Sequence, residues 1–130
     1  MCFDLEVKFA NNFINTIYRD RLLFELKTSK KRLKALMRFS HNTNDLIKKD
    51  MIYSRLKNFD YNELKLFLND KEFYVISFKY LDGIIMNVVE ILDYIRDEYM
   101  PVIVCGNNIA VIKKEVEKGE YNFYLLKKTQ

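Results

Sequence analysis

The sequence contains few of the residues that build irregular scaffolds and metal centres. Its 130 residues include only 3 Gly, 1 Pro, 2 Cys and 1 His, and no Trp. So little glycine and proline excludes a loop-rich scaffold. One histidine and two distant cysteines, Cys2 and Cys105, do not supply the ligands of a usual structural zinc site. We therefore expect no bound metal, and reduced thiols rather than a disulfide.

Long apolar runs are also missing. No run approaches the roughly 18 residues that a membrane-spanning helix needs. Residues 1–6 include two acids and lack the basic, then apolar, layout of a signal peptide. We therefore expect a cytoplasmic protein that does not contact a membrane.

What the chain does contain is enough apolar surface for one core. Hydrophobic residues make up 49% of it and charged residues 31%, a balance typical of a folded domain rather than a disordered chain. We expect one domain over residues 1–130, with a helical part over 1–70 and a sheet part over 71–130.

Helical spacing dominates the first part. Apolar residues recur at a 3.6-residue period over 8–26 and predict one amphipathic helix with Phe9, Phe13, Ile17 and Phe24 on its buried side. Two further helices are predicted over 29–40 and 60–68, with Thr28 or Ser29 as the N-cap of the first and Asp60 as the N-cap of the second.

Strand-forming residues dominate the second part. Aromatic and β-branched residues predict strands over 72–78, 101–105, 109–116 and 121–127, with turns at Gly83, Gly106 and Gly119. The Asp82-Gly83 turn also indicates a hairpin into Ile84, Ile85 and Met86. Helical spacing returns over 87–99, where Val88, Leu92, Ile95 and Tyr99 align. The fold class is therefore predicted as α+β, with N-terminal helices packed on a mostly antiparallel sheet of about four strands that contains one crossover helix.

Basic residues cluster on the second predicted helix. Residues 1–50 carry eleven basic and six acidic residues, and the formal charge of the whole chain is +4. Six basic residues and no acid lie between Lys27 and Arg38. Lys30, Lys31, Lys34 and Arg38 share one side of the helix, where they can contact nucleic-acid phosphates or form a solvated face. Lys30 and Lys31 oppose the helix dipole, which favours a functional role.

Acidic residues form a stripe on the predicted crossover helix. Glu90, Asp93 and Asp97 lie opposite its apolar side, with Glu98 nearby. Asp97 and Glu98 also oppose the dipole, at the C-terminal end. The stripe is interpreted as a partner-binding surface or, again, a solvated face.

Catalytic chemistry has few candidate residues. A nucleophile and base would have to come from Cys105, or from a hydroxyl, with the lone His41. Cys105 lies in an apolar strand and is expected to be a buried hydrophobe, and His41 is expected to cap a helix C-terminus. The isolated glycines form no phosphate-binding loop, so no nucleotide cofactor is expected. We predict no enzymatic activity.

Several short motifs point to a group of proteins. The basic helix from Lys30 that ends in Ser40-His41, a Tyr-Val-Ile-Ser strand at residues 74–77, and an Asp82-Gly83 turn resemble a group of small uncharacterised bacterial proteins. In its general type the chain is similar to immunity proteins of bacterial toxin systems. That likeness implies a non-enzymatic inhibitor that binds a cognate toxin. The alternative is a nucleic-acid-binding or regulatory module that uses the basic helix over 27–38.

Overall fold

A central antiparallel sheet organises the fold. The computed structural model describes residues 2–69, 72–78, 81–114 and 122–128. In these ranges the sheet has six strands in the order β1-β6-β5-β4-β2-β3. The strands are β1 (Ile52–Leu56), β2 (Glu72–Ser77), β3 (Ile85–Asn87), β4 (Val102–Cys105), β5 (Ile109–Lys113) and β6 (Phe123–Lys127).

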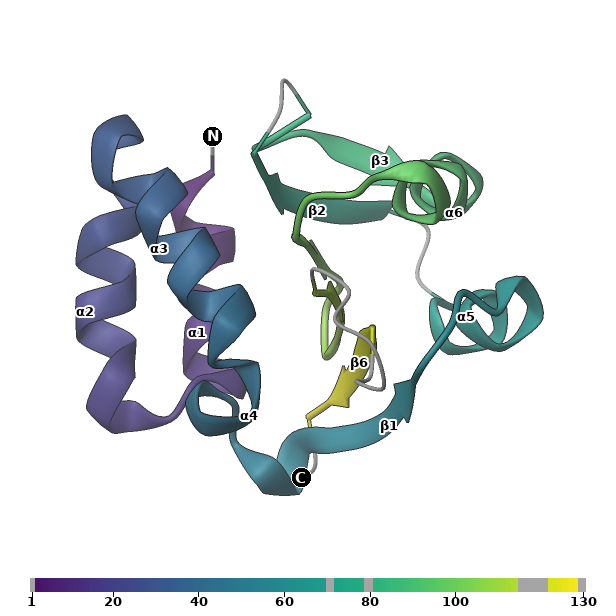
Figure 1. Ribbon diagram of the computed structural model, residues 1–130, viewed down its shortest axis with the longest axis horizontal. Coiled ribbons are helices and arrows are strands. Elements are labelled where there is room, and N and C mark those ends of the chain that lie inside the picture. The colour runs from purple at the N-terminus through teal and green to yellow at the C-terminus, as the bar shows by residue number, and fades with distance from the viewer. Residues whose placement is uncertain (1, 70–71, 79–80, 115–121, 129–130) are drawn as a thin grey trace.

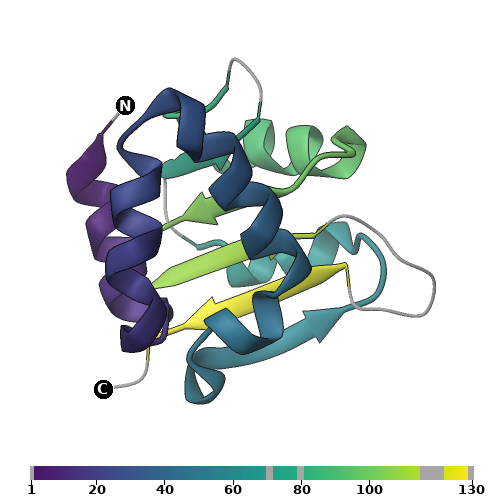
Figure 2. The same cartoon turned by 60° about the vertical axis from the view of Figure 1, so that its left-hand side comes forward.

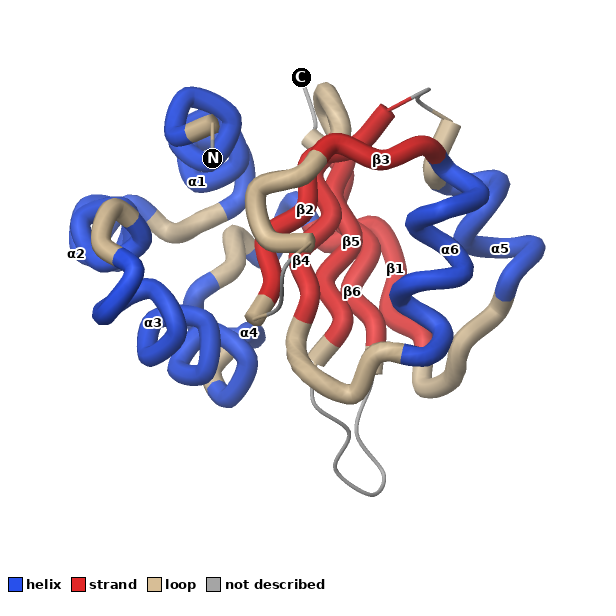
Figure 3. The backbone as a smooth tube through the Cα atoms, turned by 90° about the horizontal axis from the view of Figure 1, so that it is seen from above, coloured by secondary structure: helices blue, strands red, loops and turns tan. Residues whose placement is uncertain are grey.

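Helices cover both faces of this sheet (Figure 1). One face packs against the N-terminal layer, and the other packs against two later helices, an arrangement that is also visible from above (Figure 3). The N-terminal layer contains α1 (Phe3–Phe13), α2 (Thr16–Leu26), α3 (Ser29–His41) and α4 (Thr43–Leu46), followed by the short 3-10 helix η1 (Lys49–Met51). The second layer contains α5 (Tyr61–Phe67) and α6 (Val88–Asp97).

The side chains of the strands point alternately to the two faces of the sheet and so contribute to two hydrophobic cores. Successive side chains of a strand point to opposite faces, so a strand covered on both sides is apolar throughout. Tyr74, Ile103 and Ile112 belong to the core beneath the N-terminal helices. Val75 and Val104 belong to the core beneath α5 and α6. The predicted α+β class is therefore confirmed, and the uninterrupted apolar run over 102–105 has its explanation.

The predicted helix over 8–26 is wrong in detail, because two helices occupy the segment and the first begins at Phe3. Ile14 adopts an extended conformation and forms an isolated bridge with Ile47. The side-chain amide of Asn15 donates to the backbone oxygens of Asp45 and Ile47. These bonds to a segment 30 residues away stabilise the break, and local periodicity does not reveal them.

The predicted number of strands is also too low. β1 lies inside the part predicted to be helical. β3 follows the Asp82-Gly83 turn, where the sequence indicated a hairpin, but it was not counted among the four predicted strands. β1 pairs with β6 at the far end of the sequence, with a register irregularity between Ile52 and Ser54. The other three helices and four strands are found close to their predicted positions, although residues 115–121, including the predicted turn at Gly119, lie outside the described residues.

The crossover helix α6 connects β3 to β4 past the intervening strand β2. Asn87 and Glu90 form a reciprocal capping box at its first turn. Tyr99, which was predicted to align with the buried side of this helix, lies beyond its end at Asp97 and is 88% exposed. No helix in the described ranges has the length and apolar character that a membrane crossing requires.

Candidate binding face on α2 and α3

The helix α2 lies on the outer side of α1 and α3, away from the sheet (Figures 1 and 2). Of its side chains only Leu22 and Leu26 are buried. Ile17 is 80% exposed and Phe24 is 59% exposed, so their predicted burial is wrong. The break at Asn15 explains the difference, because it ends the apolar side of α1 and leaves α2 to pack through other residues.

The predicted phosphate-binding set divides into two pairs with different surroundings. Lys31 and Arg38 face α2, since the ammonium of Lys31 lies 4.7 Å from the centroid of the Phe24 ring and Arg38 pairs with Glu25. Lys30 and Lys34 are exposed, and within the described part of the chain neither pairs with a carboxylate. The contact with Phe24 explains why Lys31 is tolerated in the first turn of α3.

Glu25 on α2 pairs with two arginines, Arg38 on α3 and Arg21 on its own helix. The terminal nitrogens of Arg38 donate to both of its carboxylate oxygens, and Nε of Arg21 lies 3.3 Å from one of them. The hydrogen bonds from Arg38 lower the pKa of Glu25. Neither Arg21 nor Glu25 was singled out from the sequence, although their i,i+4 spacing is the signal that identifies such a pair. We call Ile17, Arg21, Phe24, Lys31 and Arg38 the α2–α3 face.

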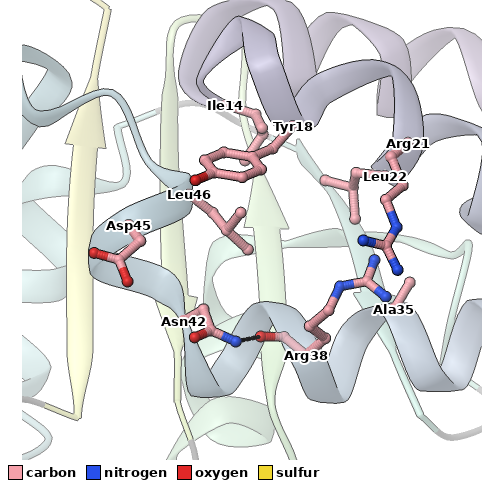
Figure 4. Close-up of a pocket in the computed structure, with 9 residues that line it drawn as sticks. All are labelled: Ile14, Tyr18, Arg21, Leu22, Ala35, Arg38, Asn42, Asp45 and Leu46. Atoms are coloured by element: carbon pink, nitrogen blue, oxygen red, sulfur yellow. Dashed lines mark hydrogen bonds between the residues drawn. The ribbon is translucent and has the colours of Figure 1, made fainter.

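A hollow of about 180 Å³ opens beside this face, between α2, α3 and α4. Figure 4 shows the guanidinium groups of Arg21 and Arg38 close together on one side of it. Apolar side chains, including Leu22, Ala35 and Leu46, form much of its lining. Asp45 lies on the other side of Leu46 from the arginines (Figure 4).

Arg32, which is one of the six basic residues between Lys27 and Arg38, is not a surface residue. It is 3% exposed and donates to both carboxylate oxygens of Glu6, at 2.7 and 2.6 Å, and to Asp82 at 2.7 and 2.9 Å. Burial opposes its charge, but the hydrogen bonds to Glu6 and Asp82 prevail and raise its pKa. The hydroxyl of Tyr74 donates to Glu6 at 2.6 Å. This network joins α1, α3, β2 and the turn after β2.

The acidic stripe is largely engaged in local structure. Glu90 caps α6 as described, and Asp93 and Asp97 both pair with Arg96, at 3.6 and 3.0 Å. Glu98 is only 7% exposed and accepts a hydrogen bond from the backbone of Met100. The stripe that faces solvent therefore consists of Glu90, Asp93 and Asp97, and the positively charged Arg96 lies among them.

A buried lysine accounts for the acids at the end of α6. The ammonium of Lys113 donates to the backbone oxygens of Ile95 and Glu98, which belong to the last turn and the cap. Burial lowers the pKa of Lys113, while the charges of Glu98 and Asp97 raise it. These two acids compensate a cation that already occupies the helix end, so their unfavourable position relative to the dipole needs no functional explanation.

The two candidate catalytic residues, Cys105 and His41, lie in different surroundings, one buried and the other exposed. Burial raises the pKa of the Cys105 thiol, which disfavours the nucleophilic thiolate. His41 is exposed, and the capping predicted for it belongs to its neighbours, because Asn42 and Thr43 donate to the last carbonyl groups of α3. Among the described residues, no three His, Cys, Asp or Glu side chains are placed to hold a metal ion.

Replacing Cys105 by serine should lower the free energy of unfolding by about 1 kcal/mol or more, because a buried hydroxyl needs a hydrogen-bond partner that the thiol does not. Cys105 lies on β4, which has a neighbouring strand on each side. Urea unfolding measures the change, and the exposed Cys2→Ser is the matched control. A stable Cys105→Ser variant that has lost a biological activity would restore the enzyme interpretation.

Comparisons of the chain with protein-family models, with curated proteins and with solved structures found no match.

Proposed function

We propose that this chain is a non-enzymatic protein-binding domain that docks an acidic partner through the α2–α3 face. In its most specific form the proposal is an immunity-type inhibitor that covers a cognate bacterial toxin domain. The observation that carries the proposal is the exposure of Ile17 and Phe24, one above the other on α2, beside arginine and lysine side chains. Aromatic residues and arginine are enriched in the centres of protein interfaces.

Charge supports an acidic partner for this face. Between residues 16 and 41 the chain has eight basic residues and two acids. Arg32 is neutralised inside the protein, and Glu25 is shared by Arg21 and Arg38. The remaining positive charge would accelerate association with an acidic surface.

Nucleic acid is the second candidate, and a separate observation favours it. Lys30 and Lys34 are four residues apart on the solvent side of α3 and make no ion pair within the described ranges. Two exposed lysines at this spacing can follow a phosphate backbone. Binding of this kind would depend on Lys30 and Lys34 and would be insensitive to Ile17 and Phe24.

Three sets of substitutions separate the possible surfaces. The first is Ile17→Ala with Phe24→Ala, the second is Lys30→Gln with Lys34→Gln, and the third reverses Glu90, Asp93 and Asp97 to Lys. A partner captured at physiological salt is identified by mass spectrometry, and its affinity for each purified variant is measured by calorimetry. We expect the first set to weaken binding about a hundredfold, because truncating central apolar contacts costs about 1–2 kcal/mol each, and the other two to have little effect.

Other outcomes contradict the proposal in defined ways. Loss of binding only in the acidic reversal would place the interface on α6. Retention of nucleic acid at physiological salt, with a salt slope that falls by about one unit for each lysine removed, would support the second candidate. For the inhibitor form, co-expression with the captured partner should relieve its toxicity in the wild type and fail to do so in the first set.

A further inference from the structure

The hollow between α2, α3 and α4 has the dimensions of a small-molecule site. Its volume of about 180 Å³ is close to the roughly 150 Å³ of an engineered protein cavity that binds benzene. A single aromatic ring fits in such a space. Leu22, Ala35 and Leu46 line it with apolar surface, of which Leu22 and Ala35 are buried.

On the side of the hollow where Arg21 and Arg38 lie, the two guanidinium groups have more N–H donors than the carboxylate of Glu25 uses. Glu25 accepts hydrogen bonds from the terminal nitrogens of Arg38 and forms an ion pair with Nε of Arg21 at 3.3 Å. The terminal nitrogens of Arg21 and the Nε of Arg38 have no further acceptor among the described residues. Two guanidinium groups around one carboxylate leave a net positive charge and unused donors in the fork geometry that suits a second carboxylate.

We propose that this hollow binds a small monocarboxylate whose apolar body is about the size of one aromatic ring. The ring lies against Leu22 and Leu46, and the carboxylate accepts hydrogen bonds from Arg21 and Arg38. A monoanion fits better than a phosphate dianion, because Glu25 and Asp45 lie beside or across the hollow and repel additional negative charge. The site shares Arg21 and Arg38 with the α2–α3 face, but this proposal does not rest on the proposed protein interface.

An NMR titration of the full chain tests the proposal with three probes. The probes are 3-phenylpropionate, its uncharged amide, and inorganic phosphate. We expect 3-phenylpropionate to shift the methyl signals of Leu22 and Leu46, and we expect the amide to bind at least tenfold more weakly because it lacks the charge. Phosphate should leave these methyl signals unchanged because it has no apolar body.

Two substitutions in the lining serve as a matched pair. Arg21 is 71% exposed on its side chain, so Arg21→Gln should fold normally and weaken 3-phenylpropionate binding about tenfold. Asp45→Asn, which removes an opposite charge from the same lining, should leave the affinity unchanged or raise it. Equal binding of acid and amide, full affinity in Arg21→Gln, or shifts outside the hollow would each overturn the proposal. None of these outcomes depends on whether the α2–α3 face binds a protein.

Discussion

Replacing Arg32 by leucine should lower the free energy of unfolding by about 3–5 kcal/mol, the usual cost of removing one partner from a buried ion pair. The substitution leaves the carboxylate of Glu6, which is 1% exposed, without its countercharge. It also removes the donors to Asp82 and to the backbone oxygen of Leu26. Urea unfolding followed by circular dichroism measures the change.

Two further substitutions on α3 make this prediction specific. Arg32→Lys keeps the charge but not the planar fork that serves Glu6 and Asp82 together, so it should recover only part of the lost stability. Lys34→Leu removes an exposed charge two residues away and should change the free energy of unfolding by about 0.5 kcal/mol or less. Equal effects of Arg32→Leu and Lys34→Leu would mean that the network does not stabilise the fold as described.

Replacing Leu92 by alanine should lower the free energy of unfolding by about 2–5 kcal/mol, because a cavity opens beneath α6. Leu92 is fully buried in the core formed by α5, α6 and the second face of the sheet. Val89 lies on the same helix but is 54% exposed, so Val89→Ala should cost about 0.5 kcal/mol or less. The same urea titration compares them, and similar losses in both variants would contradict the layered arrangement.

The spacing of apolar residues along the chain predicted the helices and strands whose burial it directly reflects. The apolar run of β4 and the spacing of Leu92 and Ile95 on α6 report burial directly, so both were recognised. The strand β1 was missed because its five residues pair with β6, about 70 residues later in the chain. No local signal in Ile52–Leu56 reveals that partner.

At the candidate site, too, burial and exposure depend on residues that are distant in the sequence. Lys30 and Arg32 are two residues apart in one basic cluster, yet the first is exposed and the second is buried between two acids. Helical phase separates the two sides of α3, but the burial of Arg32 depends on Glu6 and Asp82 from distant segments. The exposure of Ile17 and Phe24 depends on the helix break at Asn15, which is stabilised by residues of the α4 region. These contacts between distant segments cannot be predicted from the charge and hydrophobicity of the residues alone.

The strand order has a consequence for how the chain is made. Of the six described strands β6 is the last to be synthesised, yet it lies inside the sheet, between β1 and β5. Until it emerges, β1 lacks the strand with which it pairs among the described residues, and the backbone groups of β5 that pair with β6 have no partner. The growing chain therefore carries an incomplete sheet for most of its synthesis, which is the state in which exposed strand edges associate wrongly. Deleting the few residues of β6 would separate β1 from the rest of the sheet.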